Sequence, residues 1–301
     1  MLFRSTKQLN IDIVSIGGHK KGFLNKLFYT FITEYRMLKI LSTKKPDVTV
    51  AESNFYVTQS SWLKRIPSVM VAMNDHARLE NALFWPFCKN IITSHTFKKD
   101  FGKKHIRFNG YLQWLYLKEL KPSRMNKELG ITDTEKYAVI RLVHWGAHHD
   151  IGKSGLSEEQ ILQVINSLGN MKIFISSENP LPEKLKRYAL PTGPEKFQDV
   201  LFHSSLCVSE GATVAAEAAI LAIPTIYVSS ISPGYIEGMA KDGMLMHHTD
   251  LTNTEKLISE INQLLHTHNR QKVKAIVDKF DDVQSILWSN IVKYGGAHET
   301  E

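Results

Sequence analysis

Short runs of β-branched and apolar residues alternate with helical stretches along the chain, which is the pattern of parallel βαβ units. In the first part of the chain, the predicted strands are IDIVSI (11–16), DVTVAE (47–52), SVMVAM (68–73), NIITSH (90–95) and HIRFNG (105–110). After a polar stretch near residue 125, the predicted strands are YAVIRLV (137–143), MKIFIS (171–176), LCVS (206–209) and TIYVSS (225–230). The remaining chain, from about Thr252 to Tyr294, is predicted to form two or three helices.

The break in this pattern predicts two open α/β domains, residues 1–125 and 126–301. A chain of 301 residues, 43% of them hydrophobic, is long enough to build two such cores. Open parallel sheets bind ligands at the carboxyl ends of their strands, and a cleft between two domains is a natural substrate site. Candidate chemistry is therefore expected in the loops that follow the strands.

Cysteine content and hydropathy indicate the compartment. Cys88 and Cys207 are the only cysteines, and both lie in apolar stretches, which predicts buried thiols and a reducing environment. The N-terminus lacks the apolar run and small-residue cleavage site of a secretory leader. No window reaches the roughly 18 apolar residues of a membrane span. These features predict a cytoplasmic protein.

A formal net charge of +7 favours an anionic partner. Part of this charge lies between His19 and Lys45, where seven basic residues and a single acid, Glu34, accompany the apolar stripe of a predicted helix near residues 20–42. The basic residues are Lys20, Lys21, Lys26, Arg36, Lys39, Lys44 and Lys45. Such a helix could rest on an anionic membrane surface or pack its apolar face on a sheet. No recognisable nucleic-acid-binding motif accompanies the charge, so nucleic acid is not an expected partner.

The segment SEGATVAAEAAILAIPTIYVSS (209–230) has the pattern of a strand, a tight turn and a helix that ends before Pro224. Gly211 permits close backbone approach, and the amides at a helix start suit a phosphate or diphosphate. Glu217 lies near the end of the second turn of this helix, where its carboxylate could accept hydrogen bonds from two sugar hydroxyls. The alternative is a buried structural glutamate paired with a nearby base. The predicted nucleotide-binding residues of this segment are Glu210, Gly211, Ala212, Thr213 and Glu217.

This segment resembles the donor-nucleotide motif of GT-B fold proteins, which include MurG-type glycosyltransferases and UDP-N-acetylglucosamine 2-epimerases. In those proteins a Gly-rich turn, a helix with a glutamate and a G-x-P motif form the donor site. Here Ala222 stands where the usual glycine would be. The resemblance implies two Rossmann-like domains that face a cleft, with the nucleotide sugar bound by the second domain.

Nearly the whole chain is similar to domain of unknown function 354, a GT-B-like family. The blocks that carry this similarity include KPDVTVAES, IPSVMVAMNDHARLENALFWPFCKNIIT, YAVIRLVHWGAHHDIGKSGLSEEQ and SEGATVAAEAAILAIPTIYVSS. Members of this family usually begin with an additional strand, loop and helix ahead of the equivalent of IDIVSIGGHKKGF. The resemblance therefore implies that the first βα unit of the N-terminal domain is missing from this sequence.

The loop VHWGAHHDIGKSG (143–155) follows the first strand of the second half, where GT-B proteins place a loop over the donor phosphates. Its imidazoles could donate to phosphate or act as acid or base near neutral pH. The resemblance to the epimerases gives His144 a catalytic role, and Trp145, Gly146 and His148 are predicted to bind the nucleotide sugar. A metal site from His144, His148 and Asp150 is a weaker alternative, because the helical H-E-x-x-H motif is absent.

Two further strand ends carry polar side chains. VAMNDHARLENALFWPF (71–87) contains Asp75, His76 and Glu80, one of which could deprotonate an acceptor hydroxyl, and the epimerases have acidic catalytic residues in the matching region. The alternative is a helix start with Asp75 as its cap and Glu80 on a solvated face. ISSEN (175–179) places Ser176 and Glu178 where GT-B donor sites often bind the base or ribose.

These features lead to one main hypothesis and two alternatives. The main hypothesis is a metal-independent glycosyltransferase-like protein of cell-surface polysaccharide or glycolipid synthesis. It would use a nucleotide sugar, UDP-linked by resemblance, as donor substrate and no other cofactor. Its acceptor would be lipid-linked or a polysaccharide, met at the inner face of the membrane. The alternatives are a UDP-sugar 2-epimerase and a non-catalytic nucleotide-sugar-binding protein.

Overall fold

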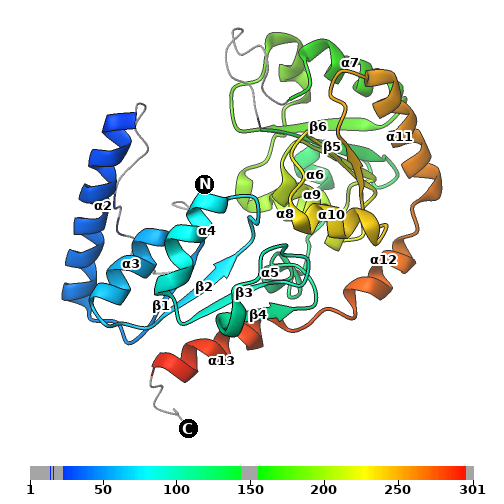
Figure 1. Cartoon of the computed structure of the whole chain (residues 1–301). Helices are drawn as coiled ribbons and strands as arrows, with labels where there is room; N and C mark the ends of the chain where they lie inside the picture. The colour runs from blue at the N-terminus through cyan, green and yellow to red at the C-terminus, as the bar shows by residue number, and fades with distance from the viewer. Residues whose placement is uncertain (1–13, 15, 17–22, 144–154, 296–301) are drawn as a thin grey trace. The chain divides into compact units, whose positions relative to one another are not determined.

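The computed structural model describes residues 14, 16, 23–143 and 155–295, and these residues form two compact units (Figure 1). Unit 1 comprises residues 1–112 and 281–301, and unit 2 comprises residues 113–280. The division predicted from the sequence, 1–125 and 126–301, differs from these units at two places. The first unit ends earlier than residue 125, and the C-terminal segment returns to unit 1.

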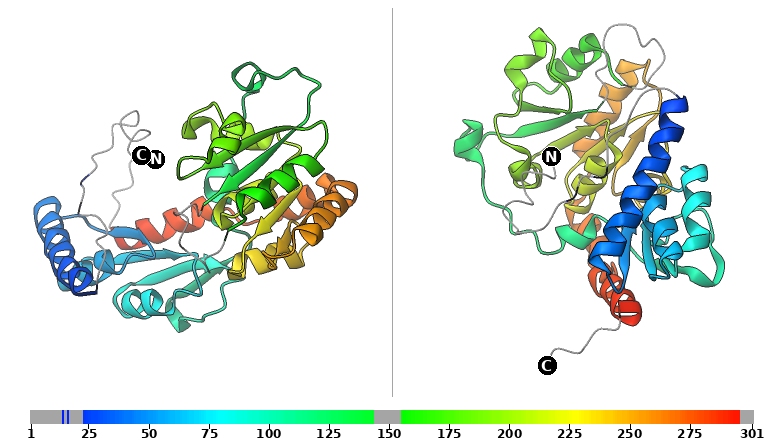
Figure 2. Two further views of the ribbon diagram at one scale, coloured as in Figure 1. Left: turned by 90° about the horizontal axis from the view of Figure 1, so that it is seen from above. Right: turned by 90° about the vertical axis from the view of Figure 1, so that its left-hand side faces the viewer.

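Unit 1 is built on a parallel sheet with strand order β1-β2-β3-β4. Its strands are β1 (Thr49–Glu52), β2 (Ser68–Ala72), β3 (Asn90–Ser94) and β4 (His105–Phe108). Its helices are α2 (Phe23–Lys44), α3 (Phe55–Leu63), α4 (Arg78–Phe84) and α13 (Val283–Gly295), with short 3-10 turns η1 (Trp85–Phe87) and η2 (Gly102–Lys104). Every residue of β2 is buried, as expected of a central strand covered on both faces. Figure 2 shows α2 as one continuous helix.

The C-terminal helix α13 belongs to unit 1 because its polar side chains pair with the sheet. The Asn90 side-chain amide donates to Asn290 Oδ1 at 2.5 Å, and the Tyr294 hydroxyl donates to Asn90 Oδ1 at 3.2 Å. Just before the helix, the Asn109 amide donates to the Asp281 carboxylate at 2.6 Å. The paired residues are separated by 200, 204 and 172 positions in the sequence. The division predicted from the sequence groups this helix with residues 126–301, whereas these contacts group it with unit 1.

Unit 2 has a second parallel sheet, with strand order β6-β5-β7-β8-β9. Its strands are β5 (Tyr137–Leu142), β6 (Lys172–Ser177), β7 (Leu206–Ser209), β8 (Thr225–Val228) and β9 (Met246–His248). Its helices are α5 (Trp114–Leu117), α6 (Asn126–Leu129), α7 (Glu158–Ser167), α8 (Phe197–Phe202), α9 (Ala212–Ile220), α10 (Gly234–Lys241), α11 (Thr254–Thr267) and α12 (Arg270–Val277), with 3-10 turns η3 (Glu183–Tyr188) and η4 (Pro194–Lys196). All eight strands expected within 47–230 are present. The strand expected at 11–16 lies mostly outside the described residues.

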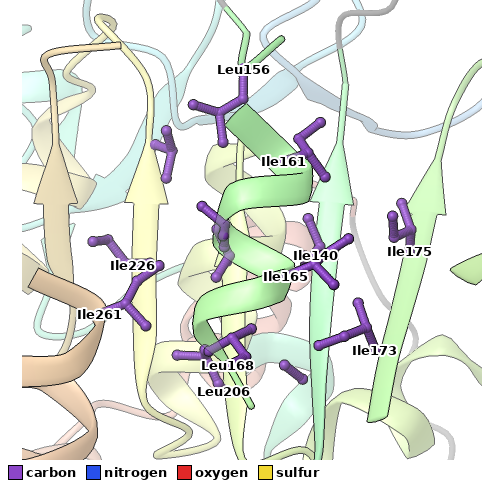
Figure 3. Packing of buried hydrophobic residues seen from close by; sticks show 14 of the residues in the cluster. Ile140, Leu156, Ile161, Ile165, Leu168, Ile173, Ile175, Leu206, Ile226 and Ile261 are labelled. Carbon is purple, nitrogen blue, oxygen red and sulfur yellow. The ribbon is translucent and has the colours of Figure 1, made fainter. Parts of the chain in front are cut away.

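Helix α7 shows how the sequence forms this core. Ser157 and Gln160 form a reciprocal capping box at its start, so the first amides of the helix have partners. The apolar side chains of its buried face pack on the sheet beside those of α11, as Figure 3 shows for α7 against β5 and β7. Helices α7 and α11 cover one face of the sheet, and α9 packs against β7 and β8. In an open parallel sheet, ligands bind at the carboxyl ends of the strands, so the loops after β5 and β7 are the ones that can hold a ligand.

Candidate functional site

The topology of unit 2 identifies one position for a ligand. The chain forms β5 and then β6 on one side of it, and it later crosses to form β7 on the other side. In an open parallel sheet, ligands bind outside the carboxyl ends of the strands where the strand order reverses in this way. Arg141 near the end of β5 is in register with Ser176 of β6 and Ser209 of β7. These three residues therefore mark the edge at which a ligand is expected.

Helix α9 begins at this edge, directly after β7. Gly211 is its N-cap and has no side chain that could cap the amides after it, while its own amide donates to Ser209 Oγ at 3.1 Å. Ala212 is half-buried and Thr213 is exposed, whereas the residues from Ala215 onward are buried. An uncapped helix start with its positive dipole end accessible is suited to bind phosphate groups.

Glycine is favoured at position 211 because neighbouring side chains approach its backbone closely. A Cβ atom added there would lie 3.1 Å from Val143 Cγ2 and 3.8 Å from Arg141 Cγ. Its φ of −91° is ordinary, so the requirement is for space and not for a left-handed conformation. The turn therefore packs directly on the end of β5.

Glu217 is buried in the middle of α9, with 7% of its surface exposed. Its Oε1 accepts a hydrogen bond of 2.5 Å from the hydroxyl of Tyr116, and the side chain of Gln198 donates a second bond to the carboxylate. Burial raises the pKa of Glu217, while these two hydrogen bonds and the charge of Arg141 act in the opposite direction. The small neighbours Ala215, Ala216, Ala218 and Ala219 let α9 pack closely on the sheet around this carboxylate.

Arg141 was not anticipated as a site residue. It is the one charged residue of β5, and its guanidinium donates to Ser176 Oγ at 2.9 Å and to Glu178 Oε1 at 2.7 Å. The predicted site residues Ser176 and Glu178 are thus brought together with each other and with the start of α9 through a side chain that sequence reasoning missed. A lone cation near the end of an otherwise apolar buried strand is the signal that could have found it.

Glu210 has backbone partners on both oxygens. Its Oε2 accepts from the amide of Val143 at 3.0 Å, and its Oε1 accepts from the amide of Leu156 at 2.8 Å. These two residues flank the loop that contains His144, Trp145, Gly146, His148, His149 and Asp150, all of which lie outside the described residues. The contacts give Glu210 a structural role, and its predicted contact with the nucleotide remains a prediction.

The candidates from the first half lie at the end of β2 and the start of α4 in unit 1. The Asp75 side chain is 3% exposed, whereas that of His76, whose Nδ1 lies 3.9 Å from Asp75 Oδ1, is 51% exposed. Glu80 is exposed in the first turn of α4, where a carboxylate stabilises the helix dipole. His76 is therefore the more accessible of the two adjacent candidates. The Asn81 side chain, which donates to the carbonyl of Asn74 at 3.1 Å, ties this loop to the helix.

Comparison with known proteins places the chain in a family. Residues 2–295 match the family described as "Protein of unknown function (DUF354)". The chain belongs to this family. An uncharacterized protein of Methanocaldococcus jannaschii is 24% identical over 285 residues, which cover 89% of this chain and 76% of that protein.

Solved structures show that this DUF354 protein has a GT-B-like fold. UDP-GlcNAc 2-epimerase from Neisseria meningitidis, solved with UDP-GlcNAc, matches with a TM-score of 0.68 and 13% identity over 97% of this chain and 88% of that one. UDP-GlcNAc 2-epimerase from M. jannaschii has a TM-score of 0.65 and 16% identity over 97% and 89%. The spinosyn rhamnosyltransferase SpnG has a TM-score of 0.58 and 12% identity over 87% and 77%. At these identities the likeness concerns the fold alone.

Two properties of the described residues concern membrane spans and metal sites. No helix among them is both long enough and apolar enough to cross a membrane. Within the same residues, no three His, Cys, Asp or Glu side chains gather as a metal site would require. The metal alternative considered above, from His144, His148 and Asp150, falls in the loop that is not described.

Proposed function

We propose that this DUF354 protein binds a nucleoside diphosphate sugar in unit 2 and transfers the sugar to an acceptor hydroxyl. The observation that carries the proposal is the buried carboxylate of Glu217 on the helix whose uncapped start lies at the switch point of the sheet. Glu217 is five residues after Ala212, a rise of about 8 Å along the helix axis. This spacing suits a diphosphate at Gly211, Ala212 and Thr213 with its ribose hydroxyls at Glu217.

The hydroxyl of Tyr116 donates to one oxygen of the Glu217 carboxylate. A carboxylate has about four lone-pair sites, so ribose hydroxyls can bind beside Tyr116 or replace it. The other named side chains of the donor site, Ser176 and Glu178, lie at the same edge of the sheet. UDP is the first nucleotide to test, because similar folds were solved with UDP or UDP-GlcNAc.

The transfer step follows from ordinary glycosyl chemistry. The acceptor oxygen forms a bond to the anomeric carbon, the bond from that carbon to the diphosphate oxygen breaks, and the nucleoside diphosphate leaves with the electron pair. A base takes the proton of the acceptor hydroxyl. His76 is the candidate base in unit 1 because its side chain is half exposed, with Asp75 and Glu80 as its alternatives. The step needs no cofactor besides the donor.

The acceptor proposed is lipid-linked or a polysaccharide, which would bring the protein to a membrane surface. Helix α2 supports this part of the proposal because it exposes Phe31 and Tyr35 next to Arg36 and Lys39. Aromatic and basic side chains on one exposed helix favour contact with anionic lipid. The wild-type protein should sediment with anionic vesicles but not with neutral ones, and a Phe31→Ser/Tyr35→Ser variant should sediment less with the anionic vesicles. If the variant sediments with them as much as the wild type does, the membrane contact is contradicted.

Calorimetric titration with UDP tests the donor site. We expect Glu217→Gln to weaken UDP binding about tenfold, because hydrogen bonds to a charged group are stronger than neutral ones. Glu255→Gln, at an exposed glutamate in the first turn of α11, is the matched control and should leave binding unchanged. Removal of the 2′-hydroxyl from UDP should weaken binding to the wild type and have little effect on Glu217→Gln. Equal losses in both proteins would show that Glu217 does not bind the ribose.

The second candidate is a 2-epimerase, favoured by the epimerases among the matching folds. Incubation with UDP-GlcNAc in the absence of acceptor separates the candidates. An epimerase returns an altered nucleotide sugar, whereas the proposed transferase releases UDP only when an acceptor is supplied. Binding with neither product, over a panel of acceptors, would indicate a non-catalytic nucleotide-sugar-binding protein.

A further inference from the structure

Arg141 and Glu178 form an ion pair in which the two partners have very different surroundings. The Arg141 side chain is 11% exposed, and that of Glu178 is 54% exposed. The same guanidinium donates a hydrogen bond to Ser176. The buried Nε of Arg141 has no hydrogen-bond partner among the described residues. The cation is therefore fixed in the protein, whereas its counter-ion lies just beyond the end of β6 with solvent around it.

The energetics of such a pair favour exchange of the counter-ion. A half-exposed carboxylate contributes little to stability, because water screens the charge and the side chain loses rotamer freedom in the pair. A guanidinium prefers planar bidentate partners, and phosphate oxygens suit this geometry as well as carboxylates do. An anionic ligand with two phosphate groups can thus displace Glu178 at small cost.

The position of Arg141 connects this pair with the start of α9. Its Cγ lies 3.8 Å from the place where a Cβ on Gly211 would be, and it is in register with Ser209 at the end of β7. Its charge acts to lower the pKa of Glu217, although burial, the larger cause, raises it. The guanidinium and the start of α9 thus lie at one edge of the sheet, and Glu217 follows further along the same helix.

We propose that Arg141 is the cation that binds the diphosphate of the ligand, and that Glu178 is a resident counter-ion which the diphosphate displaces. This inference rests on the proposed function of unit 2 and narrows its ligand to compounds with a diphosphate. It also reverses the role expected for Glu178, which competes with the ligand and does not bind it. The carboxylate of Glu178 neutralises the buried guanidinium, and a phosphate group of the ligand would take over this role.

The two partners of one ion pair should therefore have opposite effects on binding. We expect Arg141→Met to weaken UDP binding about tenfold or more, since one charge-assisted contact is lost. Glu178→Gln should strengthen UDP binding about two- to fivefold, because the competing carboxylate is gone. Uridine, which has no phosphate, should respond to neither change. Glu158→Gln, which breaks an ion pair with Lys184 of 3.3 Å elsewhere in unit 2, is the matched control.

Titration of UDP, uridine and inorganic pyrophosphate against these variants decides the inference. Weaker or unchanged UDP binding by Glu178→Gln would overturn it, even if Arg141→Met also binds poorly through misfolding. Glu178 is exposed, so its variant should fold and carries the test alone if Arg141→Met does not. If the wild type binds pyrophosphate but not UDP, and Glu178→Gln strengthens pyrophosphate binding, the nucleotide function fails and the diphosphate site stands. Absence of binding by both probes would overturn both proposals.

Discussion

The carboxylate of Glu210, directly after β7, should hold two segments that are far from it along the chain, one at Val143 after β5 and one at Leu156 before α7. It accepts one hydrogen bond from the amide of Val143 and one from the amide of Leu156, at 3.0 and 2.8 Å. Hydrogen bonds to charged groups contribute about 1.5–3 kcal/mol each. Glu210→Gln keeps one acceptor oxygen and turns a donor toward the other amide, so it should lose about 1.5–3 kcal/mol locally.

Amide hydrogen exchange measures this loss at the two donors themselves. Because each 1.4 kcal/mol corresponds to a factor of ten, exchange of the Val143 and Leu156 amides should be about ten to a hundred times faster in Glu210→Gln. Amides in the centre of the sheet, such as that of Ile140, should exchange as in the wild type. Glu183→Gln removes an exposed ion pair with Lys186 and is the control, with an expected effect within about 0.5 kcal/mol.

Two results would refute this reasoning. Unchanged exchange at Val143 and Leu156 would show that the carboxylate is not their main partner. Uniformly faster exchange over the whole of unit 2 would show that Glu210 acts on global stability and not on these two segments. Titration of Glu210→Gln with UDP gives a further readout. Because Glu210 fixes the chain next to Gly211, its loss should change the affinity for UDP more than it changes the midpoint of unfolding.

Three further predictions concern single side chains. Tyr116→Phe should change UDP affinity by at least threefold with little loss of stability. Tyr137→Phe loses a buried 2.6 Å hydrogen bond to the carbonyl of Val200, so it should cost about 1 kcal/mol of stability and leave UDP affinity unchanged. Titration with UDP measures the affinities, and urea unfolding measures the stabilities. Burial raises the pKa of Cys88 to about 11 and that of Cys207 further, so a thiol reagent at pH 8 should modify neither until denaturant is added. Burial raises the pKa of Glu217 in the folded state, so its contribution to folding stability is present below the unfolded pKa near 4.3 and is lost as pH rises. The stability of Glu217→Gln relative to the wild type should therefore increase between about pH 4 and pH 7. A stability difference that does not depend on pH would contradict the raised pKa.

Much of the fold follows from local pattern. The strands from β1 to β8 were predicted because buried parallel strands read as short apolar runs bounded by turn residues. Strand β9 was missed because it has only three residues, two of them His247 and His248, at the edge of the sheet. The return of α13 to unit 1 depends on the pairing of Asn90 with Asn290, and no local pattern reports a contact across 200 positions.

The candidate site was predicted in part. The turn at Gly211 and the glutamate of α9 have a spacing that local sequence reveals, since a strand, a glycine and a helix are consecutive there. Arg141 and Tyr116 were not found, because their importance comes from partners on other elements, Glu178 and Glu217. Ala222 stands where the resemblance to GT-B proteins leads one to expect a glycine. Its φ is +57°, so the backbone keeps the left-handed conformation that favours glycine, at a cost of about 1 kcal/mol for alanine.

The two glutamates of the SEGATVAAE segment show why one of them is suited to exchange its partners. Glu210 is bound by the backbone amides of Val143 and Leu156, and these donors cannot leave without moving the chain. Glu217 is bound by the side chains of Tyr116 and Gln198, which can rotate, and Tyr116 is 44% exposed. A ligand hydroxyl can therefore replace a partner of Glu217 by the rotation of one side chain, whereas replacement of a partner of Glu210 requires a backbone segment to move. Side chains from α5 and α8 offset part of the cost of burying this carboxylate in so small and apolar a helix, and because they are side chains they also leave it available to a ligand.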